Sequence, residues 1–286
     1  MLFGSHVSAA GGVELAPQRA AQVGCEVFQF FSRPPQGGQA RNLTAASVVA
    51  FRANCKKFKQ AESYIHTPYY INFASTTPRI RYGSISVVRE ELERGSLLGC
   101  KYVMTHLGST KQAGPKLGFH KTWRAIQRIL ESYTGSCQLL LEISSGAGDL
   151  VGSTFDELGS LIKNVESVAK HKGKVGVCLD SCHMFAAGYD LRTIEVVKKT
   201  LDEFSKKVGF KYLKLMHAND SYGEIGSKRD RHEHLGKGKI GLEGFKALVK
   251  EPRLKHVNFI LETPKDNPQD DPRNLAILKK FRGMTR

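Results

Sequence analysis

The sequence predicts an α/β protein folded as one (β/α)8, or TIM, barrel that spans residues 1–286. Two observations predict it. Short, continuously apolar runs of strand length recur along the chain, as expected for strands buried on both faces. An amphipathic helical stretch follows each run, giving eight strand-then-helix units in succession. With 41% hydrophobic residues, the chain can bury one large core.

The eight predicted strands are apolar and bounded by polar or glycine-containing turns. They are Leu2–Val7, Val27–Phe31, Tyr64–His66, Tyr102–His106, Leu139–Ile143, Val175–Leu179, Tyr212–Met216 and Asn258–Leu261. The predicted helices are Leu15–Val23, Ala46–Phe58, Ser86–Leu98, Thr122–Ser132, Asp156–Lys170, Thr193–Lys207, Leu242–Val249 and Pro272–Phe281. An open doubly wound sheet is the alternative, but the G-x-G-x-x-G motif that would favour it does not follow the first strand.

The charge balance favours a polyanionic partner. The chain has 43 Lys and Arg against 27 Asp and Glu, a net charge of +16. A surface this positive attracts polyanions, of which nucleic acid is the commonest. A basic surface that serves only solubility is the alternative. We therefore expect a nucleic-acid partner, and we expect the chain to act as a monomer.

Nothing in the sequence indicates a membrane or secreted protein. No apolar stretch approaches the roughly 20 residues that cross a bilayer, and the N-terminus resembles a strand rather than a targeting segment. The six cysteines are scattered through apolar segments, which indicates packed, reduced thiols. We expect an intracellular protein without membrane contact, in the cytoplasm or, depending on its source, in a nucleus or virion.

The residues at the ends of predicted strands three to eight form an unusual set. In a (β/α)8 barrel the active site lies at the carboxyl ends of the strands. The imidazoles and carboxylates expected there are His66, His106, Glu142, Asp180, His183, His217, Asp230, His232 and Glu262. Any one of them alone is explained as a hydrogen-bonded polar residue. Nine from six consecutive units predict a metal site at this rim.

Imidazole nitrogen and carboxylate oxygen suit zinc, manganese or iron. If each zinc takes three or four protein ligands, the nine imply two or three ions with some carboxylates bridging. Cys178 and Cys182 flank Asp180, but we interpret both thiols as packing residues because the other ligands already satisfy the metals. We expect His6 to hydrogen-bond to the ligands. The histidines expected at the surface are His120, His171, His234 and His256.

Several divalent ions beside a basic surface indicate phosphoryl chemistry. Metal ions a few ångströms apart hold both the attacking and the leaving oxygen of an in-line displacement, and a bound ion lowers the pKa of water. Glu142 and Glu262 are the expected catalytic residues, since they are placed to bridge ions or to activate water. No G-x-S-x-G motif is present, and none is needed. The residues thus predict a multi-metal phosphoesterase.

Several motifs resemble those of one family. Residues 176–190, GVCLDSCHMFAAGYD, are similar to the signature of the endonuclease IV family of apurinic/apyrimidinic endonucleases. Further segments that resemble family motifs are GSHVSAAGG (4–12), MHANDS (216–221), DRH (230–232), LGKGKIG (235–241) and LETP (261–264). The resemblance extends over nearly the whole chain.

The resemblance implies a zinc-dependent deoxyribonuclease IV with three Zn²⁺ ions, or with Mn²⁺ at one position. The implied ligand groups are His66, His106 and Glu142; Glu142, Asp180, His217 and Glu262; and His183, Asp230 and His232. The implied reaction is hydrolysis of the phosphodiester bond 5′ to an abasic site in double-stranded DNA by a zinc-activated hydroxide. It leaves a 3′-hydroxyl and a 5′-deoxyribose phosphate. Removal of blocked 3′ ends is implied as a second activity.

The resemblance also implies contacts with DNA. Tyr69 and Tyr70 match the positions from which the family inserts side chains at the lesion, where an aromatic wedge holds the bent duplex open. Arg33 and Gln36 belong to the loop after the second strand, and Arg231 lies between two ligands. We expect these three side chains to contact DNA as well.

Two loops depart from the family pattern. Residues 32–38 (SRPPQGG) stand where the family has a segment like K-S-P-R-x-W, so the tryptophan is missing and Gln36 replaces an arginine. Residues 143–148 (ISSGAG) stand where the family has N-T-A-G-Q-G, so Ile143 and Ala147 replace polar residues. Both changes concern the grip on DNA and leave the metal ligands intact.

Two other functions fit part of the pattern. A sugar isomerase or epimerase of the xylose-isomerase-like barrels also holds metal at this rim. It needs fewer, carboxylate-rich ligands and no basic surface, so the net charge and the pair Asp230 and His232 disfavour it. A non-catalytic DNA-binding protein with structural metals is disfavoured by Glu142 and Glu262.

Overall fold

In the computed structural model, which describes residues 1–284, eight parallel strands close into a barrel. The strands are β1 (Phe3–His6), β2 (Val27–Phe30), β3 (Ser63–His66), β4 (Tyr102–Thr105), β5 (Gln138–Glu142), β6 (Val175–Asp180), β7 (Leu213–His217) and β10 (Asn258–Leu261). They follow chain order around the barrel, and β10 closes on β1 with Leu261 opposite Ser5. The predicted (β/α)8 fold is confirmed.

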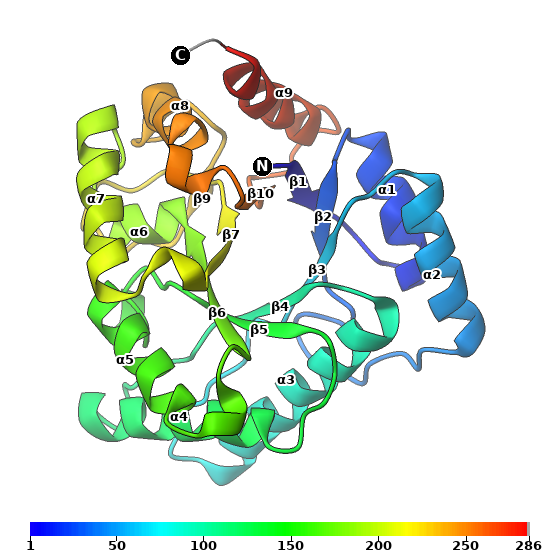
Figure 1. Ribbon diagram of the computed structural model, residues 1–286, viewed down its shortest axis with the longest axis vertical. Helices are drawn as coiled ribbons and strands as arrows, with labels where there is room; N and C mark the ends of the chain where they lie inside the picture. The colour runs from blue at the N-terminus through cyan, green and yellow to red at the C-terminus, as the bar shows by residue number, and fades with distance from the viewer. Residues whose placement is uncertain (285–286) are drawn as a thin grey trace.

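The helices form an outer ring around the barrel of strands (Figure 1). They are α1 (Ala16–Gln22), α2 (Ala45–Lys57), α3 (Pro78–Leu98), α4 (Pro115–Leu130), α5 (Phe155–Glu166), α6 (Ser181–Ala187), α7 (Ile194–Lys207), α8 (Gly241–Lys250) and α9 (Asp270–Gly283). Short 3-10 helices are η1 (Val13–Leu15), η2 (Ala147–Asp149), η3 (Ala169–His171), η4 (Phe210–Tyr212) and η5 (Pro252–Leu254). Within residues 1–284, no helix combines the length and apolar character that a membrane crossing requires.

Some helix bounds differ from the prediction. Helices α3 and α4 begin at Pro78 and Pro115, well before the predicted starts at Ser86 and Thr122. Proline is favoured in the first turn, but the largely exposed residues that follow it have no apolar period. Helix α5 ends at Glu166, because the chain tightens into η3 before β6 begins.

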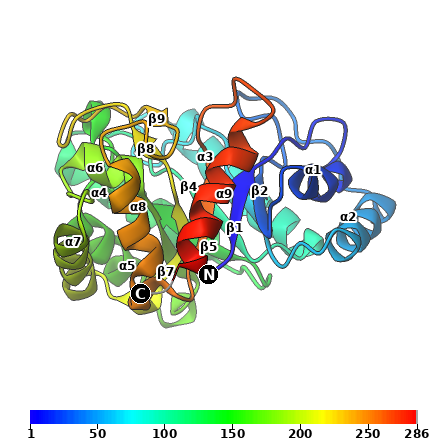
Figure 2. The ribbon, with the colours of Figure 1, turned by 90° about the horizontal axis from the view of Figure 1, so that it is seen from above.

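One helix and two short strands at the rim were not among the predicted elements. Helix α6 follows β6 directly, and Asp180 caps it by accepting a hydrogen bond from the backbone N–H of His183 at 2.9 Å. Strand β8 (Asp220–Ser221) pairs antiparallel with β9 (His232–Glu233), so that Ser221 lies opposite His232. Figure 2 shows this pair at the end of the barrel opposite the N-terminus. Helix α6 and the β8–β9 pair therefore position the predicted metal ligands His183 and His232.

Two hydrophobic clusters hold the barrel together. The larger cluster packs the sheet against the helices. The smaller one consists of residues contributed by the strands: Val27, Tyr64, Tyr102, Met104, Leu140, Cys178, Leu215 and Ile260. All six cysteines are unpaired, and Cys178 and Cys182 are fully buried. Cys178 packs in the barrel interior, whereas Sγ of Cys182 lies within 4.8 Å of potential ligand atoms of Asp180 and His232. The polar rim thus lies above an apolar barrel interior.

Candidate metal centre

The nine predicted ligands lie together at the carboxyl ends of the strands, in three adjoining groups. The groups are His66, His106 and Glu142; Glu142, Asp180, His217 and Glu262; and His183, Asp230 and His232. Within each group, one potential ligand atom per residue lies within 4.8 Å of the others. Each group therefore offers three or four donors to a common point.

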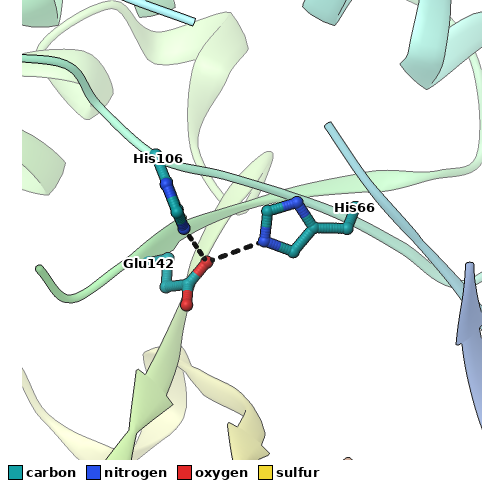
Figure 3. A group of neighbouring side chains, drawn as sticks. All are labelled: His66, His106 and Glu142. Carbon is teal, nitrogen blue, oxygen red and sulfur yellow. Dashed lines mark hydrogen bonds and ion pairs between the residues drawn. The ribbon is translucent and has the colours of Figure 1, made fainter. Parts of the chain in front are cut away.

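Glu142 lies between the first two groups. Its Oε2 is 3.2 Å from Nε2 of His66 and 3.2 Å from Nε2 of His106, and both rings point toward this oxygen (Figure 3). Its Oε1 is 3.0 Å from Nδ1 of His217. The carboxylate thus presents one oxygen to each group, which is the geometry of a bridging ligand.

The third group adjoins the second through Asp180. Nε2 of His183 is 3.1 Å from Oδ1 of Asp230, and Nε2 of His232 is 3.6 Å from the same oxygen. Oδ2 of Asp180 is 3.7 Å from Nε2 of His232 and 3.7 Å from Nδ1 of His217. The three groups therefore form one continuous pocket.

Backbone carbonyls fix three of the imidazoles. Nδ1 of His66, His183 and His232 donates to the carbonyl oxygens of Thr67, Ile143 and Glu262 at 2.6, 2.9 and 3.0 Å, respectively. Each ring then turns its Nε2 toward the pocket, the nitrogen that would bind a metal ion. Nε2 of His232 is buried without a hydrogen-bond partner in the described part of the chain. This orphaned nitrogen beside two aspartates fits a bound cation.

The electrostatics of the pocket also fit cations. Burial alone would raise the pKa of Glu142, but the imidazoles of His106 and His217 hold it well below its ordinary value. Burial likewise opposes ionisation of Glu262, yet His217 holds that pKa well below its usual range. For His183, Asp180 and Asp230 outweigh burial and raise the pKa well above its ordinary value. Ionised carboxylates in a buried pocket require positive charge, which zinc-class ions supply with this donor set.

Gln29 was not predicted from the sequence, although it connects three rim residues. Its side chain is fully buried on β2. Nε2 donates to Oε1 of Glu262 at 2.5 Å and to Nδ1 of His6 at 2.9 Å, and Oε1 accepts from Nε2 of His217 at 2.9 Å. The signal was a glutamine within the otherwise apolar run Val27–Phe30. His6 hydrogen-bonds beside the ligands, as expected.

Asn219 is a second polar residue that the sequence reasoning missed. Its Nδ2 donates to Oδ2 of Asp180 at 2.7 Å, and its Oδ1 accepts from the backbone N–H of Glu262 at 2.7 Å. It therefore holds ligands from β6 and β10 in a common frame. Its position two residues after His217 was the available signal.

Two cavities open at the rim. The smaller, of about 270 Å³, is lined by ligands of all three groups together with His6, Tyr69 and Lys265. The larger, of about 900 Å³, lies between the loops after β1 and β2 and also contacts His6 and Lys265. Lys265 was not predicted; its Nζ donates to Oγ of Ser5 at 2.9 Å. The metal centre is thus accessible from the barrel mouth.

The residues expected to contact DNA have different surroundings. Tyr69 and Tyr70 are 60% and 40% exposed, and Tyr69 lines the smaller cavity. Gln36 is exposed on the loop after β2. Arg231 is exposed, with its guanidinium carbon 4.5 Å from the centroid of the Tyr222 ring. All four are accessible to a large ligand at this end of the barrel.

Arg33 does not share this exposure. Its guanidinium is buried and forms ion pairs with Glu90 at 2.6 Å and Glu91 at 2.7 Å, both on α3. The loop after β2 folds onto α3, so the Arg33 guanidinium that was expected to contact DNA is held by these two carboxylates instead.

Two histidines expected at the surface are buried instead: His171 and His234. Nδ1 of His234 accepts a hydrogen bond from Asn274 at 3.1 Å, which ties the loop after β9 to α9. His171 ends η3, which places its ring beside residues of α4. Neither contact is visible in a local sequence pattern.

The chain is similar in sequence and in structure to known proteins. Residues 17–282 match the family model described as a xylose isomerase-like TIM barrel. The chain is 39% identical over 284 residues to "Probable endonuclease 4" of Methanoculleus marisnigri, with 99% of each chain covered. The crystal structure of endonuclease IV from Thermus thermophilus is similar with a TM-score of 0.86 and 34% identity, covering 98% of each chain.

A more distant likeness concerns the fold alone. A D-tagatose 3-epimerase-like protein has a TM-score of 0.73 over 98% of this chain and 97% of its own, but only 18% sequence identity. Barrel architecture at this level is therefore shared with proteins named for sugar chemistry.

Proposed function

Because the chain belongs to the xylose isomerase-like TIM-barrel family, and within it to the endonuclease IV proteins, we propose that it is a metal-dependent DNA-repair endonuclease. It hydrolyses the phosphodiester bond 5′ to an abasic site in double-stranded DNA, leaving a 3′-hydroxyl and a 5′-deoxyribose phosphate. It also removes blocking groups from 3′ ends. The observation that carries this proposal is the convergence of five imidazoles and four carboxylates in three groups.

The nine ligands hold three Zn²⁺ ions in this proposal, with Mn²⁺ able to replace zinc at one position. Bound ions of this kind withdraw charge from a phosphoryl group and lower the pKa of water. Glu142, whose side chain is fully buried, holds the first two groups at a fixed separation. Glu262 retains 17% exposure of its side chain, so it faces the cavity where substrate enters. Its carboxylate is the group placed to accept a proton from water there.

The rim outside the metal centre binds the DNA. Tyr69, at the mouth of the smaller cavity, fills the gap that the missing base leaves, and Tyr70 supports the bent duplex beside it. Arg231 and Gln36 contact the DNA backbone from exposed loops. Arg33 acts indirectly, since its ion pairs anchor the loop after β2 to α3. The protein acts as a monomer on DNA inside the cell. Its compartment is the cytoplasm in a cell that has no nucleus.

The test is cleavage of a labelled duplex that carries one tetrahydrofuran abasic analogue, compared with the same duplex without it. Metal-loaded protein should cut only the modified duplex, at the phosphodiester bond 5′ to the analogue. A polymerase should then extend the new 3′ end. Chelation should abolish cleavage, and Zn²⁺ should restore it. Intact abasic duplex after incubation with metal-loaded protein would overturn the proposal, and epimerisation of a ketohexose would replace it with the sugar-epimerase alternative.

A further inference from the structure

A basic groove lies on the outside of the barrel, away from the metal centre. It has a volume of about 690 Å³ and lies between α3, α4 and η3. Figure 1 shows α3 and α4 side by side on the outer ring. No residue lines both this groove and either rim cavity. It is therefore a separate surface that the proposed reaction does not use.

The groove is strongly and one-sidedly charged. Its cations are Arg81, Lys121, Arg124, Arg128 and Lys170, against the single carboxylate of Glu131. None of these five cations forms an ion pair with a carboxylate within residues 1–284, whereas Arg89 on α3 pairs with Glu93 at 2.7 Å. Five crowded positive charges with one carboxylate among them are the electrostatic footprint of an anionic ligand.

An exposed aromatic ring lies among these cations. Tyr82 is 46% exposed, and the guanidinium carbons of Arg81 and Arg128 lie 4.9 and 5.0 Å from its ring centroid. His171 also lines the groove and is buried, with an exposed fraction of 3%, and neither ring nitrogen has a hydrogen-bond partner in the described chain. The groove therefore offers cations and a stacking surface together, with an unpartnered histidine buried in its wall.

We propose that this groove binds a single strand of nucleic acid. The cations hold successive phosphates, and one unpaired base stacks on Tyr82, which is how single-stranded nucleic acids are bound without sequence preference. A duplex fits less well, because its bases already stack on one another and cannot reach the tyrosine. An acidic peptide would satisfy the cations but would not stack on the exposed ring. The site keeps the protein on nucleic acid independently of any lesion.

The test is the binding of fluorescent oligo-dT to metal-loaded protein over a range of salt concentrations, measured by fluorescence anisotropy. The charge-reversal variant is K121E/R124E/R128E. Its matched control is K199E/K206E/K211E, which reverses three exposed lysines of α7 and η4. Three reversals of two charges each lower the net charge from +16 to +10 in both variants. The stacking variant is Tyr82→Ala.

The groove variant should bind oligo-dT at least about tenfold more weakly, and the slope of log K against log salt should fall by about 2, since each lost phosphate contact contributes about 0.7. Tyr82→Ala should weaken oligo-dT binding by about fivefold or more and leave duplex binding unchanged. The control should bind like the wild type, and all variants should cut the abasic duplex normally.

Equal losses in the groove variant and its control would overturn the proposal, because only diffuse charge would then be at work. An unaffected Tyr82→Ala variant, or displacement of oligo-dT by polyglutamate but not by other nucleic acid, would also overturn it. These readouts use intact oligo-dT, so they remain decisive even if the protein fails to cut abasic DNA.

Discussion

Glu142 and Glu262 occupy equivalent positions at strand ends, yet their surroundings give them different roles. Glu142 is fully buried, and both its oxygens face imidazoles. Glu262 is partly exposed, and Gln29 and His6 hold one of its oxygens. Glu142 is therefore suited to fix the geometry of the pocket, and Glu262 is suited to meet the substrate.

Glu262→Gln should separate DNA binding from cleavage. The amide keeps the size of the side chain but cannot accept a proton from water, so we expect single-turnover cleavage to fall by about 100-fold or more. Binding of the abasic duplex, measured by anisotropy, should stay within about threefold of wild type because the DNA-contacting rim is unchanged. Glu243→Gln, at an exposed position on α8, is the matched control. Full activity of Glu262→Gln would remove Glu262 from the reaction.

Gln29→Leu should weaken metal binding without removing any ligand. The leucine retains the volume but loses the hydrogen bonds to Glu262, His6 and His217. Loss of such outer partners lowers metal affinity by about 10- to 100-fold. Competition with a chromogenic zinc chelator measures this directly, with exposed Gln112→Leu as control. Wild-type zinc affinity in Gln29→Leu would show that the glutamine serves packing alone.

At this scale, the sequence predicted the group of candidate ligands but not the residues that support it. The convergence of the nine candidate ligands was predictable because parallel strands place their carboxyl ends at one rim, so residues far apart in sequence meet there. Gln29 was missed because strand period alone does not show that its side chain points to the pocket. Arg33 was assigned to DNA because Glu90 and Glu91, its partners on α3, are not neighbours in the sequence.

At the scale of elements, helix α5 begins with an N-cap that can be tested on its own. Oγ1 of Thr154 accepts from the backbone N–H of Glu157 at 3.1 Å, and Oε2 of Glu157 accepts from the backbone N–H of Ser153 at 3.1 Å. Such reciprocal contacts satisfy N–H groups that have no partner inside the helix.

Thr154→Ala should lower the free energy of unfolding by about 1 kcal/mol, because it removes the capping oxygen. Urea denaturation of the metal-loaded protein measures the change. Thr154→Ser keeps the hydroxyl and should unfold like the wild type. Cleavage of abasic DNA should be normal in both variants, since α5 contributes no ligand. Slower cleavage by Thr154→Ala under conditions in which the variant stays folded would show that α5 supports the rim directly.

Strands were easier to predict than helix ends or rim elements. Buried parallel strands are continuously apolar, so each of the eight was found within a few residues of its bounds. The first turns of α3 and α4 face solvent and lack an apolar period. Strands β8 and β9 are two residues long and depend on the ligands and turns around them. Elements that depend on tertiary contacts therefore could not be predicted from local sequence patterns.

At the scale of the whole molecule, the metal centre connects strands β3 to β7 and β10. Removing the ions should therefore weaken the entire barrel, since ionised carboxylates would be left in a buried pocket. Bound ligand stabilises by about 4 kcal/mol at a thousand times its Kd, so we expect chelation to lower Tm by about 5 °C or more. Added Zn²⁺ should restore Tm at about three ions per chain, as judged by elemental analysis. An unchanged Tm, or saturation at one ion, would contradict a trinuclear centre.

The seam between β1 and β10 has a consequence for biosynthesis. Ser5 lies opposite Leu261, so the ring of strands closes only after β10 has been synthesised. Glu262, which follows β10 at once, joins the pocket at the same moment. All five imidazoles of the candidate ligands precede β10 in the chain, so they are synthesised before the pocket is complete. Metal binding by the complete pocket would therefore follow the slow, long-range closure of the ring by β10.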